Sequence, residues 1–168
     1  TVTLAARAPN VLVVNASLPV RSVKEVIALA KARPGELNYA SSSNASASHL
    51  SGELFNSMAG VNIVRIPYRG AGAGAIIDLV VGRVQMMFGT AGSVAAHVKS
   101  GKLRALAVTS AQPSALFPGL PTVANTVPGY EMVSMSGIFV PAGTPEAIIR
   151  QLNQGILQVL SRTDIKER

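Results

Sequence analysis

Short apolar runs that alternate with segments of helical period constrain the fold of this chain more than any other feature. The apolar runs predict strands at residues 2–6, 11–14, 37–40, 63–68, 84–88 and 103–109. The helical period predicts helices that end near residues 33, 59, 81 and 100. Such alternation is typical of an α/β fold with a largely parallel sheet flanked by helices. Hydrophobic residues make up 48% of the chain, enough for a sizeable core.

Charge and residue content exclude several classes of protein. Lys and Arg outnumber Asp and Glu by 15 to 8, but the basic residues are dispersed, and aromatic residues make up only 4%. Nucleic-acid-binding proteins cluster their basic residues and interleave aromatic ones, so we expect no nucleic-acid partner. No apolar stretch approaches the roughly 20 residues of a membrane-spanning helix. Because the chain has no cysteine, disulfides and thiolate metal sites are excluded.

Capping residues and prolines indicate where elements begin and end. Ser22 and Glu25 form a capping box that opens a helix. Thr144 and Pro145 predict the N-cap and first residue of a final helix. Residues 110–129 are rich in proline and irregular, which predicts a linker between a compact α/β unit and a trailing strand–helix unit.

Three predicted strands are each followed by a loop of small residues and then by a helix. These loops are residues 41–48, 69–74 and 89–93. Because the carboxyl ends of parallel strands meet at one edge of a sheet, we expect the loops to lie close together. Each helix N-terminus offers unpaired N–H groups and a partial positive charge, and the first loop adds serine hydroxyls. The sequence therefore predicts a pocket for a carboxylate or a phosphate.

The second loop also supports an alternative, a nucleotide-binding enzyme. Residues 70–75 match the G-x-G-x-x-A fingerprint of NAD-binding domains, after a predicted strand and before a helix. The acidic residue expected about 20 positions further on to bind the ribose is missing, because the next acid after Asp78 is Glu131.

Few residues are arranged for catalysis. His49 and His97 are the only histidines, and neither has a nearby Asp or a second histidine at ligand spacing. Asp78 falls in mid-helix among apolar residues, which favours a structural role. The pattern indicates binding without chemistry, with neither a cofactor nor a metal.

A series of short motifs extends along the whole chain. The series consists of NYASS from residue 38, SHLSGELF from 48, IPYRG from 66, GKLRALAV from 101, LPTV from 120, PGYE from 128 and PAGTP from 141. In this order the motifs resemble the Bug family, the periplasmic solute-binding proteins of tripartite tricarboxylate transporters. The resemblance implies a periplasmic receptor, not an enzyme, that captures a small organic carboxylate and delivers it to membrane transporter subunits.

The resemblance also implies a division into lobes. Members of the family consist of two α/β lobes that close on the ligand. Residues 1–8 correspond to a crossover strand, 9–127 to the second, ligand-binding lobe, and 128–168 to an incomplete segment that returns to the first lobe. We expect a fragment that lacks most of the first lobe to expose apolar surface and to self-associate.

The candidate ligand-binding residues lie in or beside the three loops. The family often has Asp in the place of Gly89, where it can meet an amino or hydroxyl group, so the glycine favours a ligand with an uncharged or bulkier body. The full set is Ser43, Asn44, Ser46, Ser48, His49, Arg69, Gly70, Ala71, Gly72, Gly89 and Thr90.

Overall fold

The structure, a computed structural model, divides the chain into two compact units and describes residues 1–69 and 72–166. Unit 1 consists of residues 1–8 and 134–168, and unit 2 of residues 9–133. The candidate residues Gly70 and Ala71 lie outside the described residues. None of the helices described in these ranges is long and apolar enough to cross a membrane.

The sheet of unit 2 has the strand order β3-β2-β4-β1-β5. Its strands are β1 (Thr3–Asn15), β2 (Asn38–Ser41), β3 (Val64–Pro67), β4 (Met86–Thr90) and β5 (Leu103–Val108). β2 pairs in parallel with both β3 and β4, whereas β1 runs antiparallel to β4 and β5. The expected α/β fold is therefore confirmed, but the sheet is mixed because its long strand β1 runs against the other four.

The predicted boundaries of the first two strands are also wrong. The two short strands predicted at residues 2–6 and 11–14 are one continuous strand, because residues 7–10 between them stay extended. Inside unit 2 this strand alternates between the two faces of the sheet, with Leu12 and Val14 in one core and Val11 and Val13 in the other. Burial on both faces explains why the sequence here is an unbroken apolar run.

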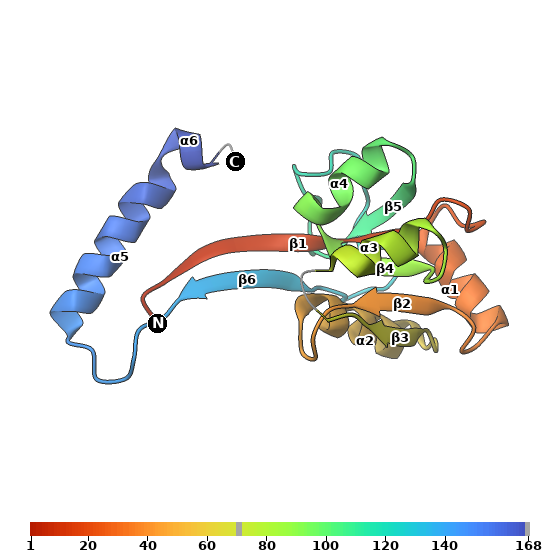
Figure 1. Cartoon of the computed structure of the whole chain (residues 1–168), viewed down its shortest axis with the longest axis horizontal. Helices are drawn as coiled ribbons and strands as arrows, with labels where there is room; N and C mark the ends of the chain where they lie inside the picture. Colours follow the sequence, from red (N-terminus) through yellow and green to blue (C-terminus); the bar gives the residue numbers. More distant parts are fainter. Residues whose placement is uncertain (70–71, 167–168) are drawn as a thin grey trace. The chain divides into compact units, whose positions relative to one another are not determined.

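Helices cover both faces of the sheet, so unit 2 has three layers (Figure 1). α1 (Val23–Ala32) and α2 (Ala47–Ala59) contribute buried residues to the core that contains Leu12. α3 (Ala73–Val80) and α4 (Ala91–Lys99) contribute to the core that contains Val11. All four helices follow the predicted order, and α2 ends before Gly60, which adopts a left-handed conformation with φ 61°.

The cap of α1 differs in one contact from the predicted capping box. The Glu25 N–H donates to Ser22 Oγ at 3.2 Å, as predicted. The Glu25 carboxylate accepts a hydrogen bond from the Arg21 N–H at 2.6 Å, rather than from the N–H of Ser22.

The proline-rich segment is part of unit 2 and not a linker, so that prediction is wrong. It contains a short 3₁₀ helix, Val123–Asn125, and buries Val127 in the core together with Tyr130, which follows the segment directly. The Tyr130 ring packs edge-on against Phe55, with ring centroids 6.3 Å apart, and its hydroxyl donates to the Ser51 carbonyl oxygen at 3.0 Å. Irregular backbone here covers the same sheet face as α1 and α2.

Unit 1 is a strand–helix segment with little buried surface. It contains all but the first residue of β6 (Val133–Ile138), which pairs with β1, followed by α5 (Glu146–Ser161) and α6 (Thr163–Lys166). The Val2 N–H donates to the Ile138 oxygen at 2.8 Å, and Asn153 Nδ2 donates to the Val2 oxygen at 2.8 Å. No residue of α5 is buried.

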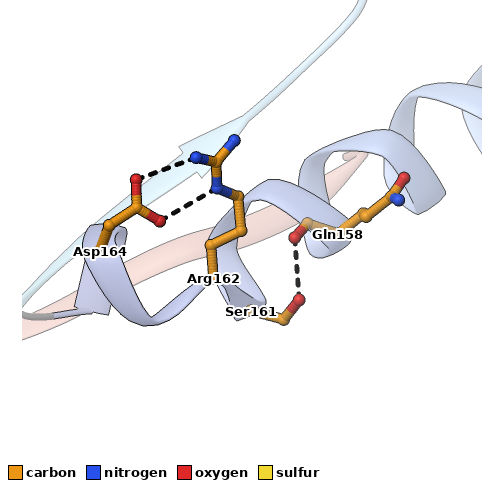
Figure 2. Close-up of polar contacts among 4 residues, drawn as sticks. All are labelled: Gln158, Ser161, Arg162 and Asp164. Atoms are coloured by element: carbon orange, nitrogen blue, oxygen red, sulfur yellow. Dashed lines mark hydrogen bonds and ion pairs between the residues drawn. The ribbon is translucent and has the colours of Figure 1, made fainter.

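The two ends of α5 are fixed by local contacts. The helix begins at Glu146 with Pro145 as its N-cap, so the prediction of Thr144 as N-cap is wrong; the Thr144 hydroxyl instead donates to the Pro141 oxygen at 2.8 Å. Beyond the other end, Figure 2 shows the Arg162 guanidinium paired with both oxygens of Asp164, each at 3.0 Å. Both side chains are more than half exposed, so the pair contributes little stability.

Candidate anion-binding pocket

The carboxyl ends of β2, β3 and β4 lie side by side, because these three strands are parallel neighbours. The pocket at this edge has a volume of about 310 Å³, and we call it the serine pocket. It is lined by Asn10, Ser42, Ser43, Ala47, Ser48, Gly72, Ile76, Met87, Phe88, Thr90 and Ser93. The structure thus brings together four of the predicted site residues, Ser43, Ser48, Gly72 and Thr90.

The first loop, residues 41–48, is held by hydrogen bonds among its own serines, and we call it the serine loop. The Ser42 N–H donates to Ser48 Oγ at 3.1 Å, and Ser46 Oγ lies 3.1 Å from the same oxygen. Ser46 is the N-cap of α2, where its Oγ accepts from the His49 N–H at 3.3 Å. Ser46 therefore shapes the loop without lining the serine pocket.

His49 also supports the loop. Its Nδ1 accepts a hydrogen bond from the Ala45 N–H at 3.0 Å. Ala45 has a φ of 58°, and it is the one non-glycine residue with a positive φ among the residues that the structure describes. Because a left-handed alanine is strained, a partner for its N–H helps to hold this conformation. His49 lines neither the serine pocket nor the pocket beside it.

Arg65 of β3 fixes the other end of the serine loop. Its Nε donates to Ser41 Oγ at 2.6 Å, its Nη1 to Asn44 Oδ1 at 2.7 Å and its Nη2 to the Ser42 carbonyl oxygen at 3.1 Å. The planar guanidinium can satisfy three acceptors in fixed directions, which a lysine cannot. The sequence analysis missed Arg65, because a charged residue on a short edge strand resembles any solvated surface position.

A second pocket of about 420 Å³ shares Ser42 and Ser43 with the serine pocket. We call it the arginine pocket; its lining consists of Ser42, Ser43, Asn44, Arg65, Pro67, Tyr68 and Arg69. Two further predicted residues, Asn44 and Arg69, belong to it. None of the described residues that line the two pockets is acidic.

The other two helix N-termini at this edge lack side-chain caps. Gly72 is the N-cap of α3, with φ 81°, and Thr90 is the N-cap of α4; neither makes a side-chain capping hydrogen bond. The Thr90 hydroxyl donates to Ser93 Oγ at 3.0 Å instead. Both helix N-termini therefore keep a partial positive charge that no side-chain cap offsets.

Gly89 lies at the same edge but lines neither pocket. It is buried in β4, and a Cβ atom at this position would collide with the Val94 side chain of α4. The glycine is thus required by close packing of α4 on the strand, and an acidic side chain here would need Val94 to move.

Asp78 makes structural contacts, as its place in mid-helix predicted. The Tyr68 hydroxyl donates to its Oδ2 at 2.8 Å, and Arg83 Nη1 donates to Oδ1 at 2.9 Å. The hydrogen bond from Tyr68, supported by that from Arg83, lowers the pKa of the Asp78 carboxyl below its ordinary value. Asp78 therefore stays ionised, tethered and outside both pockets.

Sequence reasoning missed several other residues of the serine pocket. Asn10 lies on β1, where it pairs in register with Thr90, and it is buried with its Nδ2 3.4 Å from Ser51 Oγ. A polar residue directly before the apolar run 11–14 was the available signal. Met87 and Phe88 belong to a predicted buried strand, and Ile76 to a predicted helix. That these three residues line one pocket could not be inferred without the strand order.

The chemistry of the two pockets suits an anion. Their described lining consists of hydroxyls, helix N-termini, two guanidinium groups and apolar side chains. Among residues 1–69 and 72–166, no group of three His, Cys, Asp or Glu side chains is placed to hold a metal ion. These features are those expected of a site that binds a small anion.

Comparison with known proteins agrees with this class. Residues 1–168 match the family described as Tripartite tricarboxylate transporter family receptor. The chain belongs to this family, whose members include the Bug proteins. Protein BugT of Bordetella pertussis is 38% identical over 95% of this chain and 49% of its own length. The chain spans about half the length of the curated relatives it matches.

Solved structures of similar fold are also binding proteins. A chain solved as R. palustris Rpa4515 with adipate has a TM-score of 0.89 and 40% identity; the match covers 98% of this chain and 55% of that one. MatC from Rhodopseudomonas palustris with bound malate has a TM-score of 0.87 and 27% identity, over 98% and 56% of the two chains. The fold is thus that of periplasmic binding proteins.

Proposed function

We propose that this chain forms the ligand-binding lobe of a periplasmic receptor that captures a small organic carboxylate for a tripartite transporter. The observation that carries the proposal is the serine pocket, which combines hydroxyls and helix N-termini without side-chain caps, and whose described lining residues include no acid. Two similar structures were solved with the dicarboxylates adipate and malate, which supports a carboxylate as the ligand class.

In this function the pocket residues bind and orient one carboxylate. The Ser43 and Ser48 hydroxyls and the first turns of α3 and α4 donate to its oxygens, because backbone and hydroxyl donors at helix ends favour an anion. Ile76, Met87 and Phe88 provide an apolar surface for the carbon body of the ligand. Closure of a second lobe over the ligand would exclude water and present the closed receptor to the membrane subunits.

We infer that no chemical step follows binding. His49 uses its Nδ1 to accept from the loop backbone, and Asp78 is engaged by Tyr68 and Arg83. Among the described residues, no ion pair joins a histidine to an acid. The alternative is an NAD-binding enzyme domain that uses residues 70–75. The described residues of this segment make no contact that favours it.

A thermal-shift panel with dicarboxylates, aromatic carboxylates, amino acids and NAD tests the proposal. A ligand at about 100 times its dissociation constant adds roughly 2.7 kcal/mol to the free energy of unfolding, a readily measured rise in Tm. We expect a rise with at least one carboxylate and none with NAD. A rise with NAD alone would favour the enzyme alternative and overturn the receptor.

A further inference from the structure

The serine loop contains a turn whose third residue is strained. The Ser46 N–H donates to the Ser43 carbonyl oxygen at 3.2 Å, which closes a four-residue turn over residues 43–46. Ala45 is the third residue of this turn, and its φ of 58° is a value for which turns usually carry glycine or asparagine. Without a compensating contact, the alanine would relax to a negative φ by rotation of the peptide that joins it to Asn44.

His49 supplies the compensating contact. It is the third residue of α2 after the Ser46 N-cap, and its own N–H donates to Ser46 Oγ at 3.3 Å. Its Nδ1 accepts from the Ala45 N–H at 3.0 Å. In a capping box the side chain at this position accepts from the N–H of the N-cap residue, whereas here an imidazole accepts one residue earlier. The acceptor therefore fixes the direction of the Ala45 N–H and the orientation of the peptide that contains it.

The strained turn lies between two residues of the serine pocket. Ser43 begins the turn, Ser48 follows it by two residues, and both line the pocket. The Ser42 N–H donates to Ser48 Oγ at 3.1 Å, so the two sides of the loop are joined. Rotation of the peptide before Ala45 would change the backbone angles between the two pocket serines and with them the spacing of their hydroxyls.

We propose that His49 is a positioning residue of the serine pocket, whose neutral imidazole holds Ala45 in the left-handed conformation and so keeps the two serine hydroxyls in place for an anion. The inference rests on the proposed function, because that function makes this pocket the binding site. The hold on Ala45 can be measured without a ligand. Nδ1 accepts only while it carries no proton, so the neutral ring has its proton on Nε2. His49 lines neither pocket and acts through the loop backbone.

The first experiment measures amide hydrogen exchange of the loop in the intact, ligand-free protein. His49→Leu removes the acceptor, whereas His49→Asn places an amide oxygen close to the position of Nδ1. We expect His49→Leu to speed exchange of the Ala45 amide by about threefold to tenfold, the effect of one lost hydrogen bond, and His49→Asn to restore most of the protection. His97→Leu is the matched control, because His97 is also partly exposed but lies in the last turn of α4 and lines neither pocket. It should leave the Ala45 amide unchanged.

The second experiment measures the dissociation constant of adipate by calorimetry. His49→Leu should weaken binding by about threefold to tenfold, and His49→Asn should stay within about twofold of the wild type. In an Ala45→Gly background the same His49→Leu change should cost less than about twofold, because glycine adopts a positive φ without strain. If adipate does not bind, the acid that raises Tm most in the thermal-shift panel replaces it.

A pH series adds a measurement that a merely structural side chain would not affect. Because a doubly protonated imidazole has no acceptor at Nδ1, wild-type affinity relative to that of His49→Asn should fall from about pH 8 to about pH 5. Both proteins share the neighbouring ionisable side chains of α2, the sheet and the segment after it, so the comparison cancels their titration together with that of adipate. These side chains are Glu53, Tyr39, Arg65 and Tyr130.

The outcomes distinguish this inference from the proposed function. Equal exchange of the Ala45 amide in the wild type and in His49→Leu would overturn the positioning role. Faster exchange that His49→Asn does not restore would overturn it as well, because the shape of the ring and not its acceptor would then hold the loop. A constant affinity ratio across the pH series would contradict the need for a neutral ring. If exchange changes as expected but neither adipate nor any other acid of the panel binds, the proposed function itself fails.

Discussion

Unit 2 and unit 1 contain helices with similar apolar periodicity, but only unit 2 buries them. Apart from Val2, every fully buried hydrophobic side chain of the described residues lies in unit 2. In unit 1, α5 exposes Ile148, Leu152, Leu157 and Val159 by two fifths or more. The comparison teaches that an amphipathic pattern predicts a helix in both units, whereas stability comes from the layer that covers its apolar face.

Matched leucines in two helices give the largest expected difference. Leu79 of α3 is fully buried, and Leu157 of α5 is 48% exposed. Leu79→Ala should lower the free energy of unfolding by about 2–5 kcal/mol, because it removes buried atoms and leaves a cavity. Leu157→Ala should change it by less than about 0.5 kcal/mol. Both changes in the free energy of unfolding can be measured by urea denaturation followed by circular dichroism.

The same substitution in the same type of element keeps helix propensity equal in the two variants. A cost above about 2 kcal/mol for Leu157→Ala would mean that the face of α5 is covered in solution, for example by the expected self-association. Sedimentation velocity on the wild type and on Leu157→Ala would then show whether a second copy provides the cover.

Substitution of one glycine in each unit by alanine is expected to change stability in opposite directions. A Cβ atom on Gly52 of α2 would collide with the buried Tyr39 ring, whereas a Cβ on Gly155 of α5 meets nothing within 4 Å. Gly52→Ala should cost about 1–3 kcal/mol through overpacking, despite the better helix propensity of alanine. Gly155→Ala should stabilise α5 by about 0.5–1 kcal/mol.

Amide hydrogen exchange measures both effects helix by helix. Protection factors should fall in α2 for Gly52→Ala and rise in α5 for Gly155→Ala. Unchanged protection of α2 would show that Tyr39 moves aside at no cost, although its hydroxyl donates to Glu53 Oε1. That result would contradict the tight packing of this helix on the sheet.

The sequence predicts local structure better than it predicts the layers. The end of α2 before Gly60 and the start of α1 after Ser22 follow from backbone conformation and side-chain caps, which depend on nearby residues. The direction of β1 and the burial of Val127 and Tyr130 depend on which segments meet in space. An apolar run in a central strand has the same pattern whichever way the strand runs. Periodicity therefore cannot decide between parallel and antiparallel pairing.

The candidate site likewise contains some residues that the sequence predicts and others that depend on contacts between distant segments. Topology alone brings Ser43, Ser48, Gly72 and Thr90 to one edge of the sheet, as the three loops predicted. Arg65 could not be predicted as a site residue, because its role depends on three acceptors that lie between 21 and 24 positions away along the chain. The lobe boundaries and the individual ligand contacts stay predictions that binding measurements have to test.

Alkaline pH provides the smallest expected effect, and it falls on unit 2 alone. All three tyrosines of the chain, Tyr39, Tyr68 and Tyr130, lie in unit 2. Burial raises the pKa of Tyr39 and of Tyr130 above its ordinary value, and burial together with the hydrogen bond to Asp78 raises the pKa of Tyr68 to about 12. In the unfolded chain the same phenols ionise near pH 10.

The sign of the effect follows from proton binding. Below about pH 10 both states hold the phenol protons, so the stability is fully present; above it the unfolded state releases them first, and stability falls as pH rises towards the folded pKa. Tyr130→Phe removes a buried hydrogen bond to the Ser51 oxygen and should cost about 1 kcal/mol at pH 8. Between pH 10 and 11 the difference between variant and wild type should shrink, because phenylalanine cannot ionise. A difference that stays constant from pH 8 to pH 11 in urea titrations would show that the pKa of Tyr130 is the same in the folded and unfolded states, and would contradict the raised pKa of this buried phenol.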